Sequence, residues 1–153
     1  MESIKTKLLR IQFNFFPAFR RTGGRITYIA HDYFEIRIKL PLNWKTRNYV
    51  GTIYGGSIYA SVDPIYMMML IKILGSDYII WDKAATIRFK KPGRSTLYAT
   101  FRLEQKEIDF IKNELTQKEK IDRVYYIELV DNQGVVHAYV EKVLHIKNKN
   151  PLA

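Results

Sequence analysis

The segment from Gly55 to Leu74 constrains the fold more than any other part of the chain. Its apolar side chains recur at helical spacing and others fill the remaining faces, so it predicts one long helix that stops at Gly75. A helix that is apolar on nearly every side has to be buried, and we expect its second half to lie in the core. The residues at helical spacing are Ile58, Val62, Ile65, Met69 and Ile73.

Strand-like stretches flank this helix on both sides. Residues 34–40 alternate between apolar and charged side chains, as a half-buried strand does. Short turns at His31–Asp32 and Asn132–Gly134 predict two hairpins. Two strands are predicted before the helix, at residues 25–30 and 34–40, and four after it, at residues 78–89, 97–104, 123–131 and 135–146.

The first part of the chain is basic and amphipathic. Apolar residues between Leu8 and Phe19 recur at roughly helical spacing among lysines and arginines, with Pro17 interrupting the segment and Gly23–Gly24 ending it. This pattern predicts a helix that covers the core or closes a pocket. The charged insert at residues 105–120 predicts a short helix or a long excursion at the sheet edge.

The predicted order is therefore a helix, two strands, one long buried helix and four strands. A single apolar helix beside a run of antiparallel strands has to bury itself against one face of their sheet. We therefore expect one α+β domain spanning residues 1–153, with an antiparallel sheet of about five or six strands wrapped around the central helix.

The composition excludes several kinds of site. There are no cysteines, which rules out disulfides, zinc–thiolate sites and cysteine nucleophiles. His31, His137 and His145 are too scattered to form a metal-ligand motif, so we expect no metal. The longest uninterrupted apolar run, Pro64 to Ile71, is far shorter than the roughly 20 residues of a bilayer span. No secretion signal is recognisable at the start, so we expect a cytoplasmic enzyme or binding domain.

The formal net charge of +10 favours an anionic partner such as nucleic acid, anionic lipid or a phosphorylated small molecule. Lys90, Lys91 and Arg94 cluster beside a Pro-Gly turn, and a looser basic group lies near the start of the chain. No nucleic-acid-binding motif is recognisable. The plain alternative is a solvated basic surface that keeps the protein in solution. The looser group consists of Lys5, Lys7, Arg10, Arg20, Arg21 and Arg25.

Residues 48–63 carry the chemistry that distinguishes this sequence from a generic α+β domain. Gly55 and Gly56 open the helix, so their N–H groups have no helical acceptor and lie at the positive end of the helix dipole. Because glycine has no side chain, a carbonyl oxygen can come close to these groups, as an oxyanion hole requires. Asp63 is a carboxylate in an otherwise apolar helix, where it could act as a general base or a nucleophile.

The spacing of these residues also bears on assembly. Gly55 and Asp63 are eight residues apart, which on one helix separates them by about 12 Å along the axis. One reacting carbon cannot contact both. Two antiparallel copies of the helix across a two-fold axis can bring Gly55 of one chain to Asp63 of the other, so a site of this type implies a dimer.

Each of these residues also has a plain structural interpretation. Asp63 could be the N-cap of a helix that begins at Pro64; if the helix instead runs from Gly55, Pro64 should kink it. Tyr54 could be an ordinary packing aromatic, although its hydroxyl could also donate to a carbonyl oxygen. Asn48 could be a turn residue of a polar loop.

The pattern of residues 48–63 resembles the hotdog-fold acyl-CoA thioesterase superfamily, in particular the branch that includes the phenylacetate-pathway thioesterases. That branch carries Asn, then Gly, then His-Gly-Gly, then Asp on the central helix. Here Asn48 lies six residues before Tyr54 and Asp63 nine residues after it, with Tyr54 where the branch has histidine. Residues 84–94 resemble the family's third strand and phosphate-side loop. Over its whole length the chain is most similar to hotdog-like domains without an assigned reaction.

The resemblance implies a hotdog fold, a homodimer or tetramer, and hydrolysis of an acyl-CoA thioester without a metal or a further cofactor. Asp63 would activate water or attack the thioester directly. The amides of Gly55 and Gly56, with Tyr54 beside them, would polarise the carbonyl, and Asn48 would orient the carboxylate or the water.

The resemblance also implies that Lys90, Lys91 and Arg94 meet the phosphates of the coenzyme. Two other functions stay open. The first is a non-catalytic acyl-CoA or fatty-acyl binding module of the same fold, which Tyr54 in place of histidine and the Pro64 that follows Asp63 favour. The second is a peripheral membrane or nucleic-acid binder that uses the basic start of the chain, although we expect neither a nucleic acid nor a membrane as a partner.

Overall fold

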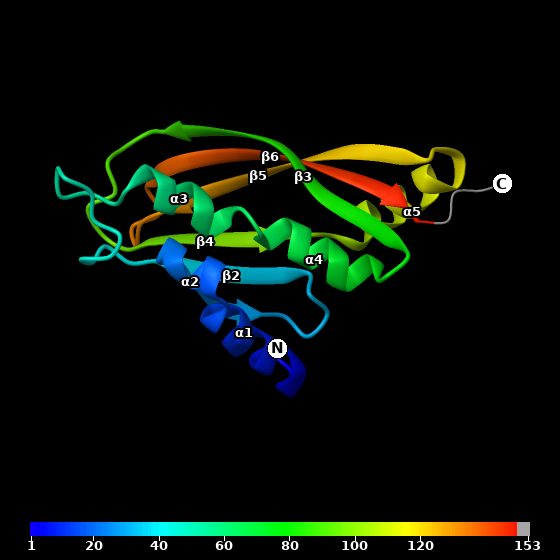
Figure 1. Ribbon diagram of the computed structural model, residues 1–153, viewed down its shortest axis with the longest axis horizontal. Helices are drawn as coiled ribbons and strands as arrows, with labels where there is room; N and C mark the ends of the chain where they lie inside the picture. Colours follow the sequence, from blue (N-terminus) through cyan, green and yellow to red (C-terminus); the bar gives the residue numbers. More distant parts are fainter. Residues whose placement is uncertain (150–153) are drawn as a thin grey trace.

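The computed structural model describes residues 1–149 and shows a curved antiparallel sheet wrapped around two consecutive central helices (Figure 1). Its six strands lie in the order β1-β2-β4-β5-β6-β3, so β1 and β3 form the two edges. The predicted α+β architecture is confirmed, and the last residues of the predicted domain, 150–153, lie outside the described part. The helices are α1 (Ile4–Phe15), α2 (Pro17–Thr22), α3 (Gly55–Val62), α4 (Ile65–Leu74) and α5 (Gln105–Gln117), and the strands are β1 (Arg25–Ile29), β2 (Glu35–Leu40), β3 (Tyr78–Phe89), β4 (Leu97–Arg102), β5 (Lys120–Val130) and β6 (Val136–Asn148).

The central helix is interrupted at Asp63 and Pro64, between α3 and α4. The N–H of Asp63 donates to Tyr59 and closes α3, and the carbonyl of Pro64 accepts from Met68 in the first turn of α4. Proline has no N–H to continue the ladder of α3, and its ring crowds the preceding turn. The predicted disturbance at Pro64 is confirmed, and the segment predicted as one helix forms two.

The central helices fill the concave face of the sheet. Most of α4 is buried, as predicted, with Ile71 as an exception at 43% exposed. By length and composition Gly55–Leu74 could cross a membrane, but half of its most apolar window is buried inside this fold, as in the core helix of a globular domain. The buried residues of α4 are Ile65, Tyr66, Met68, Met69, Leu70 and Leu74.

Strand β3 pairs with β6 along its whole length and, within residues 1–149, has no strand on its other side. A register shift between Asp82 and Ala84 marks a β-bulge. Asp82 lies opposite Leu144 before the bulge, and Ala85 lies opposite Lys142 after it. Because directly opposed residues share a face, Asp82 lies on the same inner face of the sheet as Leu144 and Lys142, toward the central helices.

Helix α1 covers the β1 edge of the sheet (Figure 1). The side chain of Asn14 donates to the carbonyl of Ile26 at 2.9 Å and accepts from its N–H at 2.8 Å. The carboxylate of Glu2 accepts from the N–H of Ile29 at 3.0 Å and from Arg10 at 2.9 Å. Polar side chains from the start of the chain thus satisfy backbone groups that an edge strand would otherwise expose.

The N-terminal segment predicted as one helix also forms two. The break falls at Phe16, and Pro17 occupies the first turn of α2, where its missing N–H does no harm. The charged insert forms the helix α5, which is one of the two structures predicted for it. The buried residues of this helix are Ile108, Ile111 and Leu115.

Two isoleucines of α4 test the burial of the central helix. Ile65 is fully buried and Ile71 is 43% exposed. We expect Ile65→Ala to lower the free energy of unfolding by about 2–5 kcal/mol, because it leaves a cavity in a closely packed core. Ile71→Ala, with the same change in helix propensity, should lower it by less than about 1 kcal/mol. Urea unfolding measures both, and equal losses would contradict the packing described here.

Candidate active site

A cleft of about 320 Å³ lies at the start of α3, between the loop before this helix and the loop after β3. It brings together four of the site residues predicted from the sequence: Asn48, Gly55, Lys90 and Lys91. Tyr54, Gly56 and Arg94 do not line it. The remaining lining residues are Thr52, Ile53, Ile58, Phe89, Pro92 and Gly93.

The two glycines at the start of α3 are required by close packing. A Cβ on Gly55 would lie 2.9 Å from the ring of Phe89, and one on Gly56 would lie 2.3 Å from the ring of Tyr54. Within residues 1–149, the N–H groups of Gly55 and Gly56 have no protein acceptor. Gly55 therefore has an unpaired N–H group and lines the wall of the cleft, and its role in an oxyanion hole stays a prediction.

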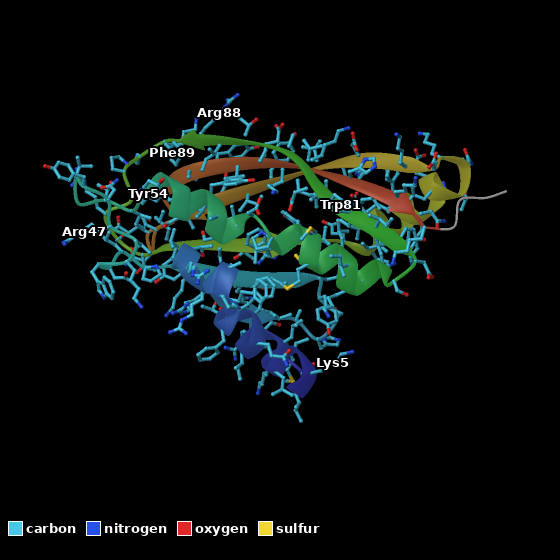
Figure 2. The ribbon with its side chains drawn as sticks, in the orientation of Figure 1. Lys5, Arg47, Tyr54, Trp81, Arg88 and Phe89 are labelled. Atoms are coloured by element: carbon cyan, nitrogen blue, oxygen red, sulfur yellow. The ribbon has the colours of Figure 1, made fainter. Side chains whose placement is uncertain are left out.

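Tyr54 and Asn48 support this end of the helix. Tyr54 is the N-cap residue of α3, without a side-chain cap hydrogen bond, and its ring is 59% exposed beside Gly56. Figure 2 shows Tyr54 and Phe89 near the same end of α3. The amide of Asn48 accepts from the N–H groups of Val50 and Thr52 and donates to the hydroxyl of Thr52. Its side chain thus holds its own loop closed and makes no bond to Asp63.

The basic cluster lies on the loop that follows β3. The N–H groups of Lys90 and Lys91 both donate to the carbonyl of His137, and the loop is further tied down by a hydrogen bond between His137 and Pro92. The side chains of Lys90 and Lys91 remain exposed at the cleft, and Arg94 is exposed on the same loop. This loop presents three positive charges at one side of the cleft.

Asp63 lies at the other end of α3, in a cluster with Tyr59, Asp82 and Lys142. The ammonium of Lys142 donates to Oδ1 of Asp63 at 2.5 Å and pairs with Oδ1 of Asp82 at 2.6 Å. The hydroxyl of Tyr59 donates to Oδ1 of Asp63 at 2.7 Å. The side chain of Lys142 is 1% exposed, whereas that of Asp63 is 38% exposed. Within residues 1–149, Oδ2 of Asp63 has no partner and is free to interact with a ligand or water.

This arrangement differs from the capping interpretation of Asp63. Asp63 has helical backbone angles, α4 is preceded by Pro64 as its N-cap, and no side chain caps α4. The carboxylate instead reaches across to β6. Asp63 therefore ends α3 through its backbone N–H, and its side chain does not cap the start of α4.

Lys142 was not identified as a site residue from the sequence, although the pattern of its strand indicates that it is buried. On β6 the residues that alternate onto the inner face are Ala138, Val140, Lys142, Leu144 and Ile146. A lysine at an inward position of a buried strand needs an anionic partner. Finding that partner requires the tertiary structure, because Asp63 and Asp82 lie far from it in sequence.

The electrostatics of the cluster follow from this burial. Burial alone would lower the pKa of Lys142, but its hydrogen bonds and the charges of Asp63 and Asp82 outweigh burial and raise it. Burial raises the pKa of Asp82 above its usual range despite the Lys142 ammonium. Burial and the hydrogen bond to Asp63 raise the pKa of Tyr59, which keeps the phenol protonated as a donor at neutral pH.

An apolar pocket of about 200 Å³ reaches Asp63 from the side of α1 and α2. Three phenylalanines from the N-terminal helices form one wall, and Ala60 and Pro64 of the central segment form the other. A carboxylate with a free oxygen therefore stands at the border of an apolar space. The complete lining is Phe13, Phe16, Ala18, Phe19, Thr22, Ala60, Asp63 and Pro64.

The structure thus divides the predicted site into two halves. The cleft includes Gly55 but not Asp63, and the apolar pocket includes Asp63 but not Gly55. Helix α3 separates them by its whole length, as the spacing predicted. The described residues contain no group of three or more His, Cys, Asp or Glu side chains that could hold a metal ion.

The chain belongs to the family described as "Domain of unknown function (DUF4442)", whose model matches residues 5–146. A comparison with curated proteins found no match.

Solved structures share this architecture along nearly the whole chain. A protein of unknown function from Pseudomonas aeruginosa, titled a probable thioesterase, has a TM-score of 0.82 at 21% identity, covering 94% of this chain and 95% of that one. A protein of unknown function from Chlorobaculum tepidum has a TM-score of 0.75 at 13% identity, covering 95% of each chain. A thioesterase from Haemophilus influenzae has a TM-score of 0.70 at 16% identity, covering 96% of this chain and 93% of that one. These similarities show that the fold is the hotdog fold, which confirms the prediction from the sequence.

The buried lysine gives a test of the cluster through protein stability. We expect Lys142→Met to lower the free energy of unfolding near pH 7 by about 2–4 kcal/mol, less than for a fully buried pair because both carboxylates are partly exposed. In the unaltered protein the pKa of Lys142 is raised above its ordinary 10.5, so its contribution is present at neutral pH and is lost only at higher pH.

Without the ammonium, Asp82 should bind its proton still more tightly in the folded state, so the stability of the variant should fall as the pH rises from about 4 to about 7. Urea unfolding at several pH values measures this slope. As a control, Lys83→Met removes an exposed lysine that also pairs with an aspartate, Asp122, and should leave the midpoint near pH 7 almost unchanged. An equal loss of stability in Lys142→Met and Lys83→Met would contradict the burial of Lys142.

Proposed function

We propose that this protein is a thioesterase that hydrolyses an acyl-CoA or a related acyl thioester in the cytoplasm. The observation that carries the proposal is the carboxylate of Asp63. Its Oδ1 is held by Lys142 and Tyr59, and its Oδ2 is unpaired at the border of an apolar pocket. That pocket has the apolar lining that an acyl group requires, and the thioesterase titles of similar structures are consistent with this function.

In the proposed reaction Asp63 acts as a general base. Its free Oδ2 accepts a proton from water as the oxygen of that water attacks the thioester carbonyl carbon. When the carbon–sulfur bond breaks, the protonated carboxyl group of Asp63 gives this proton to the departing sulfur, so the acid and the thiol are released and the carboxylate is restored. Tyr59 and Lys142 fix the carboxylate through its other oxygen. They are positioning residues, because neither lies on the free side of the carboxylate.

The cleft at the start of α3 supplies the other half of the proposed site. The N–H of Gly55 stabilises the negative charge that develops on the carbonyl oxygen. Lys90 and Lys91 at the cleft, with Arg94 on the same loop, meet the phosphates of coenzyme A. Asn48 keeps the opposite loop in place through its three hydrogen bonds within that loop. No metal and no further cofactor take part in the proposal.

The two halves act together only in a homodimer. We propose that two copies associate through the free edge of β3, with the two strands antiparallel across a two-fold axis, so that Gly55 of one copy faces Asp63 of the other. The edge supports this arrangement because β3 is 12 residues long and most of its residues from Trp81 to Phe89 are exposed. A long open edge is a template for pairing with another strand.

Replacement of the carboxylate tests the catalytic proposal. Asp63→Asn should reduce thioester hydrolysis by a factor of about 100 or more, because the amide cannot accept the proton of water. Its oxygen can still accept from Tyr59 and Lys142, and Asp82 still pairs with Lys142, so the fold should survive. The readout is the free thiol of coenzyme A from a panel of acyl-CoAs, and the protein has no cysteine to obscure it. The control, Asp77→Asn, alters an exposed aspartate beyond the end of α4.

Retained hydrolysis in a folded Asp63→Asn variant would overturn the role of Asp63. A second candidate function, acyl-CoA binding without turnover, is favoured by the exposed Tyr54, which stands where the related thioesterases carry histidine. If the unaltered protein binds acyl-CoA but hydrolyses none, Tyr54→His is the informative variant. A gain of hydrolysis would point to a binding module derived from an enzyme.

The β3 edge gives a separate test of assembly. Ala84→Lys together with Thr86→Lys would place like charges on both copies at the edge, beside Lys83, so the pair should separate. Light scattering should give twice the mass of one chain for the unaltered protein and the mass of one chain for the variant. Thr27→Lys with Thr100→Lys, on exposed positions of β1 and β4, should remain dimeric. An active monomer would contradict the composite site.

A further inference from the structure

Helix α1 carries an apolar stripe on its outer side, away from the sheet it covers. The stripe consists of Ile4, Leu8, Ile11 and Phe15, whose exposed fractions are 81%, 56%, 49% and 66%. Their spacing of three or four residues places them in one line along the helix. The proposed reaction does not use this stripe, and the core of the domain does not cover it.

Aromatic and basic side chains continue the stripe at its C-terminal end. Phe15 and Trp44 both line one open groove of about 590 Å³, and Trp44 is 80% exposed. The guanidinium of Arg20 lies 5.8 Å from the ring centre of Phe15, and the ammonium of Lys45 lies 5.1 Å from a ring of Trp44. Arg21 lines the same groove. Apolar rings and cations are thus presented together at the surface.

This surface is almost purely positive in charge. Glu2 is the only acidic residue among the first 25, against six basic residues. Its carboxylate is already bound by Arg10 and by the N–H of Ile29. Lys5 lies on α1 at the lower side of the molecule in the view of Figure 2. The exposed cations beside the stripe and groove are Lys5, Lys7, Arg20, Arg21 and Lys45.

We propose that α1 and the Trp44 loop dock on the surface of an anionic lipid bilayer. Aliphatic and aromatic side chains on one face of a helix can enter the boundary between headgroups and acyl chains, while flanking lysines and arginines meet the phosphates. Tryptophan is favoured at the same depth. The charge of the surface selects an anionic membrane over a neutral one.

The same observations count against other occupants of this surface. A nucleic acid would use the cations but has no place for the aliphatic Ile4, Leu8 and Ile11. A second copy of the chain would bring two positive surfaces together, where like charges repel. An anionic bilayer satisfies both the apolar stripe and the charge.

The position of the surface agrees with the rest of the structure. Helix α1 packs on β1, at the opposite edge of the sheet from β3, so docking leaves the proposed dimer edge free. Phe16, which is 57% exposed, also lines the apolar pocket that reaches Asp63. Membrane docking does not rest on the proposed hydrolysis, and its test needs no substrate.

Vesicle binding tests the proposal. With Trp81→Phe, Trp44 is the one remaining tryptophan and reports the docking surface directly. Its emission should shift to shorter wavelength with vesicles of phosphatidylcholine containing about 30% phosphatidylglycerol, and affinity should fall steeply with salt. Leu8→Gln with Phe15→Gln should weaken binding about tenfold or more, because two side chains no longer enter the bilayer.

Two further variants separate the contribution of the cations from that of exposed apolar side chains elsewhere on the protein. Lys5→Gln, Lys7→Gln, Arg20→Gln and Arg21→Gln together should remove the preference for the anionic vesicles. The control, Ile71→Gln with Phe110→Gln, changes two exposed apolar residues on α4 and α5 and should leave vesicle binding unchanged.

Three results would overturn the proposal. The first is that the unaltered protein does not bind vesicles. The second is equal affinity for neutral and anionic vesicles at every salt concentration. The third is that the Ile71–Phe110 control loses as much vesicle affinity as the Leu8–Phe15 variant. Binding to a single-stranded RNA that depends on the cations but not on Leu8 and Phe15, without vesicle binding, would assign the surface to nucleic acid instead. A change of oligomeric state in the Leu8–Phe15 variant, again without vesicle binding, would assign it to a contact between copies.

Discussion

One buried ammonium group, that of Lys142, connects the parts of the fold that form the candidate site. It lies on β6 within 2.6 Å of carboxylates from the α3–α4 junction and from β3. A buried cation is stable only with anionic partners, so this contact ties Asp63 and Asp82 to defined places. Two irregularities of the fold, the break at Pro64 and the bulge of β3, occur beside these aspartates. They place the carboxylates where the ammonium can reach them.

The same contact makes the two oxygens of Asp63 different. Lys142 and Tyr59 hold Oδ1, which leaves Oδ2 unpaired in a residue that lines the apolar pocket. At the other end of α3 the N–H of Gly55 faces a cleft with a basic loop. A helix carries its positive dipole end at its N-terminus, so an amide donor and a carboxylate base are kept at opposite ends of one element. This separation is the physical reason that the proposed site requires two chains.

Much of the architecture was predictable because it depends on local periodicity. The apolar helix and all six strands were expected, and several strand ends differ from the prediction by up to three residues. The place of Gly55 at a helix start was also predicted, whereas the cleft that it lines was not. Lys142 could not be assigned a partner, because the contacts with Asp63 and Asp82 span 79 and 60 residues and depend on how β6 and β3 pair.

The sequence by itself determined the helix that the sheet surrounds, the order of the strands along the chain, and the glycines that open the helix. Each of these follows from short-range spacing and from the need to bury apolar side chains. The tertiary structure decided that Asp63 binds Lys142 and Tyr59 rather than capping α4, and that the pairing of β3 with β6 places Asp82 on the inner face. Those outcomes depend on strand register and on compensation of a buried charge, which join residues that no local pattern connects.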